Sequence, residues 1–203
     1  MQNVNSPSKA LDELRAMTCN SGSDAAHDVN RLDEPSLDLL PERGVYTIVV
    51  LVTEEKAIDV GSLGVVRMRR GLYAYTGSGL GRGALSLRGR VSRHLSKRKR
   101  LRWHIDYLTS SESSVVVGVV ASRAEKRLEC AIASTINSVA EPIEGFGCSD
   151  CKCRSHLALV PFEGIDECLR LIKEVYASLG LTPTSLALGP LQVLGAHVRQ
   201  QIH

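Results

Sequence analysis

The sequence has no long apolar run. The longest apolar stretch covers residues 115–121 and contains a glycine, whereas a membrane-spanning helix needs roughly 20 apolar residues. The opening segment, MQNVNSPSKALDELRAM, also lacks the apolar stretch of a secretory signal. We therefore expect a cytoplasmic protein that does not contact a membrane. In that compartment the six cysteines are expected to be thiols or metal ligands rather than a disulfide framework.

Acidic residues are absent from one long segment of the chain. The 36 residues from Arg67 to Arg102 include twelve Lys or Arg and no Asp or Glu. The net charge of +3 therefore divides into +12 for this segment and −9 for the remainder, which holds 13 basic and 22 acidic residues. Charge of one sign at this density predicts either a polyanionic partner or strong self-repulsion within the segment. If the partner were duplex DNA, five phosphate contacts would give a log–log salt slope of about −4 to −5.

The composition divides the chain into three parts. Residues 1–42 are acidic, punctuated by prolines and poor in apolar residues. They predict a flexible tail, because little apolar surface is available to offset the entropy of ordering. Residues 43–162 are expected to form the main domain, which includes a cysteine-rich block. Residues 163–203 are expected to form a C-terminal helical extension.

The spacing of apolar residues predicts an α+β fold, with a small, mainly antiparallel central sheet flanked by helices. Residues 45–52 form a β-branched run that is apolar on both faces, as in a central strand. Strands are also expected over 65–69 and 72–76, and three strands in quick succession predict an antiparallel meander. Further strands are predicted at 114–121 and 157–160, and helices over the stretch that carries Leu87, Val91 and Leu95 and over 103–108, 124–139 and 165–179.

Four short features follow one another in the first two thirds of the chain. The tripeptide Gly-Val-Tyr opens the first predicted strand and ends at Tyr46. The tripeptide Tyr-Thr-Gly closes the third predicted strand and begins at Tyr75. Arg90 and His94 lie one turn apart on the next predicted helix, and Glu129 lies on a later one.

In order and spacing these features resemble the GIY-YIG nuclease family. That family pairs a Gly-Ile-Tyr strand with a Tyr-Ile-Gly strand, followed by a helix with an arginine and a helix with a metal-binding glutamate. The resemblance covers residues 44–140. Beyond it, the blocks WHIDYL and GFGCSDCKCRSHL are similar to a branch of the family that is frequent in archaea and sometimes fused to DNA glycosylases. Thr76 stands where the family has an aliphatic residue, and the late asparagine of the family has no evident counterpart.

The resemblance implies a metal-dependent endonuclease that hydrolyses nucleic-acid phosphodiester bonds, with DNA favoured over RNA and the choice between them left open by the sequence. It implies Mg²⁺ or Mn²⁺ as cofactor and DNA-repair proteins as candidate partners. Arg90 offers a planar, two-pronged donor to a phosphate, and Glu129 offers a carboxylate to a sparsely coordinated Mg²⁺. Tyr46 is expected to activate the water with Tyr75 in support, and His94 is an alternative proton relay.

These assignments have alternatives. Tyr73 shares the strand face of Tyr75 and could take its place. Glu129 could instead form a salt bridge with Arg123 or Lys126. The domain as a whole could be a nucleic-acid-binding module that does not cleave, and charge alone does not separate a binder from a nuclease.

The basic segment is expected to grip the nucleic-acid backbone without reading its sequence. The expected contact residues are Arg82, Arg88, Arg93, Lys97, Lys99, Arg102 and His104. His104 and Asp106 would diverge by about 200° on a helix, so they cannot both reach one ligand. The glycine cluster at 77–83 could admit a phosphate at a helix N-terminus. A dinucleotide site is disfavoured there, because the preceding strands look antiparallel.

A cysteine-rich block near residue 150 has a donor set suited to zinc. The four side chains of this set are Cys148, Cys151, Cys153 and His156. Four ligands within nine residues is a tight spacing, because zinc sites ordinarily draw on two separated segments. Reduced thiols in a tight turn are the alternative, and a zinc-dependent structural or redox protein is a further reading of the whole chain. Cys19, Cys130 and Cys168 are interpreted as core or incidental thiols.

Overall fold

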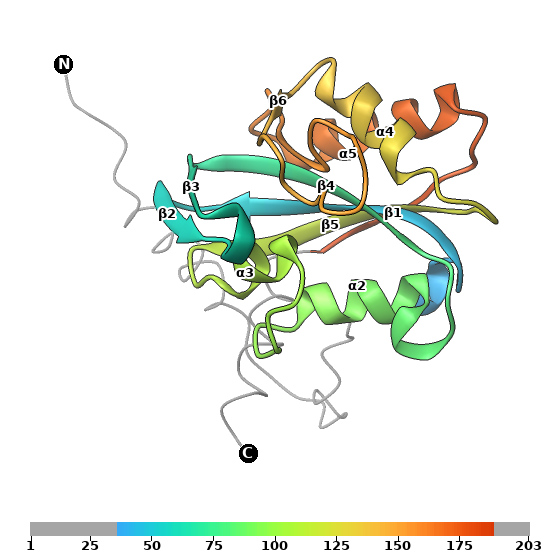
Figure 1. Ribbon diagram of the computed structural model, residues 1–203. Helices are drawn as coiled ribbons and strands as arrows, with labels where there is room; N and C mark the ends of the chain where they lie inside the picture. The colour runs from blue at the N-terminus through green and yellow to red at the C-terminus, as the bar shows by residue number, and fades with distance from the viewer. Residues whose placement is uncertain (1–35, 189–203) are drawn as a thin grey trace, which may run out of the picture. The chain divides into compact units, whose positions relative to one another are not determined.

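The described part of the chain covers residues 36–188 of a computed structural model and is built on one large antiparallel sheet (Figure 1). Its strands pair in the order β6-β7-β4-β1-β5-β8, and each pairing is antiparallel. The strands are β1 (Gly44–Val52), β4 (Gly71–Gly79), β5 (Ser114–Arg123), β6 (Glu141–Pro142), β7 (Leu157–Leu159) and β8 (Thr184–Ala187). The predicted α+β class is confirmed. Most of the predicted tail over residues 1–42 lies outside the described residues.

Helices cover both faces of this sheet (Figure 1). They are α2 (Leu87–Leu95), α3 (His104–Ser110), α4 (Glu129–Asn137) and α5 (Ile165–Ser178), with short 3₁₀ helices η1 (Leu37–Leu39), η2 (Gly61–Leu63) and η3 (Gly83–Leu85). α2 and α3 lie on one face, and α4 and α5 on the other. Within residues 36–188, none of these helices is long and apolar enough to cross a membrane.

β1 lies in the middle of the sheet between the two helical layers. Its alternate side chains therefore enter two separate cores: Ile48 packs toward α2 and α3, and Val49 toward α4 and α5. Both side chains are fully buried. The apolar run over 45–52 was predicted to be a central strand, and the structure confirms it because both faces of the strand are covered.

The strand predicted over residues 65–69 does not join the central sheet. It forms β3 (Val65–Met68), which pairs with β2 (Lys56–Asp59) in a separate two-stranded sheet. β1 pairs directly with β4 instead, so the predicted meander is wrong. The sequence did not predict β2 because its residues, Lys-Ala-Ile-Asp, are exposed at three of four positions and leave little apolar pattern.

α4 begins later than the apolar spacing predicted. Residues 124–128 are not helical, and Leu128 has φ −121° and ψ 1°. The side chain of Arg127 reaches across to Glu129 and Asp150. Because residues 124–128 lie outside the helix, Glu129 is the first residue of α4. At this position a carboxylate interacts favourably with the positive end of the helix dipole.

The segment after residue 162 adds one strand to the same sheet and one helix that packs on it. α5 confirms the helix predicted over 165–179 and packs on β5 and β1. Tyr176 of α5 is fully buried, and its hydroxyl lies 3.0 Å from Oγ1 of Thr47 on β1. β8 pairs with β5 at the edge of the sheet, a strand that the sequence pattern did not reveal.

Candidate functional site

A cavity of about 510 Å³ opens where β1, β4, α2, α3 and the start of α4 meet. Its lining includes seven residues that the sequence had singled out: Tyr46, Tyr75, Arg90, Arg102, His104, Glu129 and His156. Of the residues predicted to be catalytic, His94 alone does not line the cavity. The cavity therefore gathers most of the predicted site from segments far apart in the chain.

The pairing of β1 with β4 sets the positions of the two tyrosines. Tyr46 lies opposite Gly77, and Tyr75 lies two residues earlier on the same strand as that glycine. A Cβ atom at position 77 would come within 2.7 Å of the Tyr46 hydroxyl, so the glycine of one tripeptide makes room for the tyrosine of the other. Tyr75 lines the cavity, whereas Tyr73 donates its hydroxyl to the carbonyl of Arg69.

Tyr46 and His94 form a buried hydrogen bond. Oη of Tyr46 lies 2.8 Å from Nε2 of His94. Burial raises the pKa of Tyr46 above its usual value of 10, although Arg90 acts to lower it. Burial, followed by the charge of Lys99, lowers the pKa of His94 to about 3. Both side chains are therefore neutral at physiological pH, and the neutral imidazole can accept a hydrogen bond from the hydroxyl.

Arg90 brings a positive charge to the cavity from α2. Its Cζ lies 4.8 Å from the centre of the Trp103 ring, and Cζ of Arg93 lies 5.0 Å from the same ring. Cation–π contacts of this kind position a guanidinium without neutralising its charge. Nε of Arg90 is buried without a hydrogen-bond partner in the described part of the chain. Arg90 lines the cavity and forms no ion pair with a carboxylate among residues 36–188, so its charge is available to an anion there.

Glu129 is the buried carboxylate of the cavity. It is 4% exposed, and its Oε1 accepts a hydrogen bond from Nε of Arg127 at 2.6 Å. Nη2 of Arg127 also donates to Asp150 at 2.9 Å, and this contact lowers the pKa of Asp150. Oε2 of Glu129 is buried and has no partner among residues 36–188. The sequence missed Arg127 and Asp150, because the salt bridge was expected from Arg123 or Lys126 on a longer helix.

Several predicted nucleic-acid contacts already have partners inside the protein. Arg88 pairs with Asp38 at 3.0 Å. Lys97 donates to the main-chain carbonyls of Ser111 and Ser114 where the chain passes from α3 into β5, and Lys99 donates to the carbonyl of Arg93 on α2. Burial lowers the pKa of both lysines to about 8. Arg82 is exposed on the turn before η3 and does not line the cavity. The basic segment is therefore in part a set of internal contacts, which sequence charge could not distinguish from free cations.

His104 and Asp106 diverge on α3 as the helical spacing predicted. His104 lines the cavity, and its Nδ1 accepts a hydrogen bond from the amide of Gly147 at 3.0 Å. Asp106 is fully buried, pairs with Arg93 at 2.7 Å and accepts from the amide of Trp103 at the start of the helix. Burial acts to raise the pKa of Asp106, but these hydrogen bonds outweigh it and lower the pKa. His104 is thus at the cavity, and Asp106 holds the helix start and Arg93.

Beside the cavity, the structure assembles a cluster that could bind a metal ion. The four residues whose donor atoms all lie within 4.8 Å of one another are Cys130, Cys151, Cys153 and His156. This corrects the predicted set, in which Cys148 held the place of Cys130. Sγ of Cys148 instead lies 3.5 Å from the carbonyl of Phe146. Cys130 is within reach because α4 begins at the preceding residue, so its first turn lies against the cysteine-rich loop.

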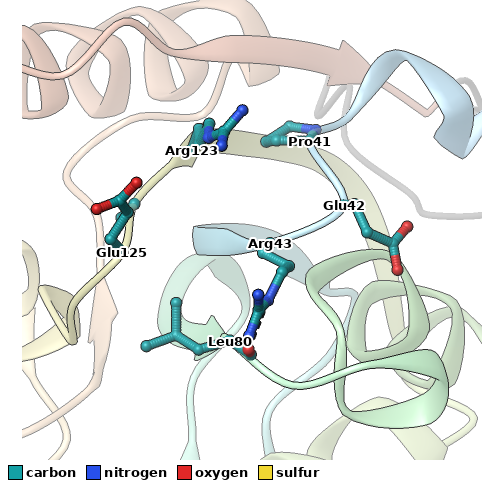
Figure 2. A pocket seen from close by; sticks show the side chains of 7 residues that line it. Pro41, Glu42, Arg43, Leu80, Arg123 and Glu125 are labelled. Atoms are coloured by element: carbon teal, nitrogen blue, oxygen red, sulfur yellow. Dashed lines mark hydrogen bonds between the residues drawn. The ribbon is translucent and has the colours of Figure 1, made fainter.

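A second hollow, of about 460 Å³, lies where the chain enters β1 and leaves β5 (Figure 2). Glu42, Arg43, Arg123 and Glu125 contribute its charged side chains. Nε of Arg43 donates to the carbonyl of Leu80 at 2.7 Å. With two acidic and two basic side chains this hollow has no preference for an anion, and it contains none of the predicted site residues.

Comparison with protein families gives a match that covers most of the described residues. Residues 45–179 match the model of the family described as Domain of unknown function DUF123. The match runs from β1 to the end of α5 and therefore includes both the cavity and the cysteine cluster. No curated protein and no solved structure matches the sequence.

Proposed function

We propose that this chain, which belongs to the DUF123 family, is a metal-dependent endonuclease of the GIY-YIG type that hydrolyses phosphodiester bonds of nucleic acid, DNA rather than RNA. The cavity carries the proposal. It brings together two tyrosines, an arginine without a carboxylate partner among residues 36–188 and a buried carboxylate, one oxygen of which has no hydrogen-bond partner in that range. Phosphodiester hydrolysis needs an activated water, positive charge beside the phosphoryl group and a ligand for a cation.

Glu129 is the residue that would hold the cation. A buried carboxylate oxygen without a partner is costly, and Oε2 of Glu129 is such an atom. Mg²⁺ fits a site with a single protein carboxylate, because it keeps waters and phosphate oxygens as its other ligands. When bound, Mg²⁺ or Mn²⁺ would neutralise charge on the phosphoryl group and lower the pKa of a coordinated water.

Arg90 binds and orients the phosphate in this proposal. Its guanidinium lies over the Trp103 ring, with Cζ 4.8 Å from the ring centre, which limits its rotation and leaves the N–H donors along its edge for phosphate oxygens. Arg102 lines the same cavity and adds a second positive charge for the nucleic-acid backbone.

Tyr46 orients the attacking water. Because burial raises the pKa of Tyr46, its hydroxyl stays protonated and acts through hydrogen bonds: it can donate to Nε2 of His94, 2.8 Å away, and its oxygen can then accept a hydrogen bond from the water. Burial lowers the pKa of His94 to about 3, so the imidazole is a hydrogen-bond acceptor and not the base that takes the water proton. That proton would leave to solvent once a bound cation had lowered the pKa of the water. The ring of Tyr75 packs edge-on to His94 with 6.0 Å between the ring centres and keeps the imidazole in place.

A second candidate function, a nucleic-acid-binding module without cleavage, is favoured by one observation. Arg127 holds Oε1 of Glu129 at 2.6 Å and so neutralises the carboxylate that cleavage would use. In a pure binder this ion pair removes a negative charge from the phosphate site. The two functions therefore differ in what they require of Glu129.

A cleavage screen on duplex, branched and single-stranded DNA and RNA, with Mg²⁺ or Mn²⁺, tests the proposal. Glu129→Gln and Arg90→Ala are expected to abolish cleavage while leaving binding within a few-fold of wild type. Glu174→Gln and Arg170→Ala are matched controls, because they remove the same charges from an exposed ion pair on α5, and they should cleave normally. Absence of cleavage by the wild type on every substrate supports the binder. Full cleavage activity of Glu129→Gln would show that the Glu129 carboxylate is not required for cleavage.

A further inference from the structure

Four soft donor atoms converge beside the cavity from two separate segments of the chain. Cys130 comes from the first turn of α4, and Cys151, Cys153 and His156 come from the loop that leads to β7. The cysteines within residues 36–188 are all free thiols. A cluster of three thiols and an imidazole without disulfides is a donor set for a thiophilic cation.

The distances within the cluster agree with tetrahedral coordination. Nε2 of His156 lies 3.7 Å from Sγ of Cys130 and 3.5 Å from Sγ of Cys151. In a tetrahedral site with Zn–S of about 2.3 Å and Zn–N of about 2.1 Å, the distance between sulfur and nitrogen ligands is about 3.6 Å. These two sulfur–nitrogen separations therefore match those around a tetrahedral zinc ion, and all four donor atoms lie within 4.8 Å of one another.

We propose that Cys130, Cys151, Cys153 and His156 bind a structural zinc ion. Three thiolates and an imidazole complete the four-coordinate shell that zinc adopts in structural sites, so no position is left for a substrate or a reactive water. The ligands also follow the usual arrangement in two segments. Three of them lie within residues 151–156, and Cys130 lies 21 positions before the first of these.

The zinc ion ties three parts of the cavity wall together. Cys130 anchors the ion to α4 directly beside Glu129. The main chain of His156 is fixed on both sides, because its amide donates to Phe146 at 2.8 Å and its carbonyl accepts from Thr76 of β4 at 2.9 Å. The ion therefore links the start of α4 to β4 through the loop that carries Asp150.

The loop needs such a link because it has little core of its own. Between residues 144 and 155, Phe146 is the only apolar side chain that is fully buried. Hydrophobic burial of one side chain cannot offset the entropy of ordering a dozen residues, since each ordered residue costs roughly 1–2 kcal/mol. A metal ion supplies the missing stabilisation, as it does in small folds with few buried residues.

Zinc content and stability of the full chain, purified under reducing conditions, test this proposal. Elemental analysis is expected to find one zinc per chain in wild type, and Cys130→Ser and Cys153→Ser are expected to lose it. Cys148→Ser is the matched control, because Cys148 lies in the same loop but outside the donor set, and it should keep the zinc. A zinc-selective chelator should lower the Tm of wild type and Cys148→Ser by at least several degrees.

Cobalt substitution guards against a variant that simply fails to fold. Wild type reconstituted with Co²⁺ is expected to show the visible absorption of a tetrahedral thiolate site, and Cys148→Ser should show the same spectrum. Zinc-free wild type that also fails to bind added Zn²⁺ or Co²⁺ would overturn the proposal. Retention of zinc by Cys130→Ser together with its loss from Cys148→Ser would overturn the ligand set. None of these measurements involves cleavage, so they stand apart from the test of the proposed nuclease.

Discussion

His94 is the buried histidine that the structure holds in its neutral form. Burial and the charge of Lys99 lower its pKa to about 3, against a partly opposing effect of Asp106, and Arg90 and Arg93 lower it further. In the unfolded chain the same imidazole titrates near its usual value of 6.5. The unfolded state therefore binds more protons than the folded state between these two values. It follows that stability falls as the pH drops from about 6.5 toward 3, and that this group has no effect above 6.5.

The expected loss is large enough to measure. At pH 5 the imidazole of the unfolded chain is protonated and that of His94 in the folded chain is not, which costs about 2 kcal/mol relative to pH 7. For a domain of this size, that corresponds to a decrease in Tm of about 4–8 °C. Glutamine in place of His94 keeps a neutral polar side chain beside Tyr46 but removes the titration.

The assay is urea unfolding of wild type and His94→Gln at pH 7 and pH 5. Whatever the stability of the variant at pH 7, its loss between the two pH values should be smaller than that of wild type by about 2 kcal/mol. His104→Gln is the control, because this partly exposed imidazole contributes less. An equal loss in wild type and His94→Gln, or an NMR titration of His94 near pH 6.5, would refute the reasoning. Such a result would also mean that His94 is not held as the neutral acceptor of the hydrogen bond from Tyr46.

Three further predictions concern other parts of the site. Gly77→Ala places a methyl group 2.7 Å from the Tyr46 hydroxyl and is expected to cost about 1–3 kcal/mol in urea unfolding; unchanged stability would contradict the close packing of the two tripeptides. Asp106→Asn removes the charge from a buried ion pair and should cost about 3 kcal/mol by the same assay, a value that an exposed pair would not approach. Because Arg90 and Arg102 face the cavity while the lysines of the segment are engaged elsewhere, DNA binding should show a log–log salt slope of about −2. A slope of −4 or steeper would mean that further basic side chains, such as the exposed Arg82 or the engaged lysines, also contact phosphates.

The pattern of apolar residues predicted individual strands and helices correctly where the pattern lay within one element. The run over 45–52 predicted a central strand, and the stripe of Leu87 and Val91 predicted the helix that packs beneath it. Pattern could not show which strands pair, because pairing depends on segments far apart in the chain. β1 does not pair with β3, which is closer in the sequence, but with β4. The polar strand β2 was not predicted, because the prediction of strands relied on apolar residues.

The candidate site was predictable to the extent that its residues lie in recognisable motifs. Tyr46, Tyr75 and Glu129 come together at one cavity, although only the structure separates Tyr75 from Tyr73. The partners that these residues meet were not predictable. Arg127 reaches Glu129 because α4 starts five residues later than its apolar spacing suggests. The same late start brings Cys130 into the metal-binding cluster in place of the predicted Cys148.

The central position of β1 gives the two walls of the cavity different resistance to local opening. β1 is paired along its whole length with β4 on one side and β5 on the other. Amides in such a strand exchange with solvent only when the whole domain unfolds, whereas a loop with few buried contacts opens at lower free energy. The wall that carries Tyr46 therefore keeps its shape, and the wall that carries Asp150 opens more readily, most of all when the proposed zinc ion is removed. A ligand that enters the cavity would therefore contact a rigid wall at β1 and a wall that can change its conformation at the loop that carries Asp150.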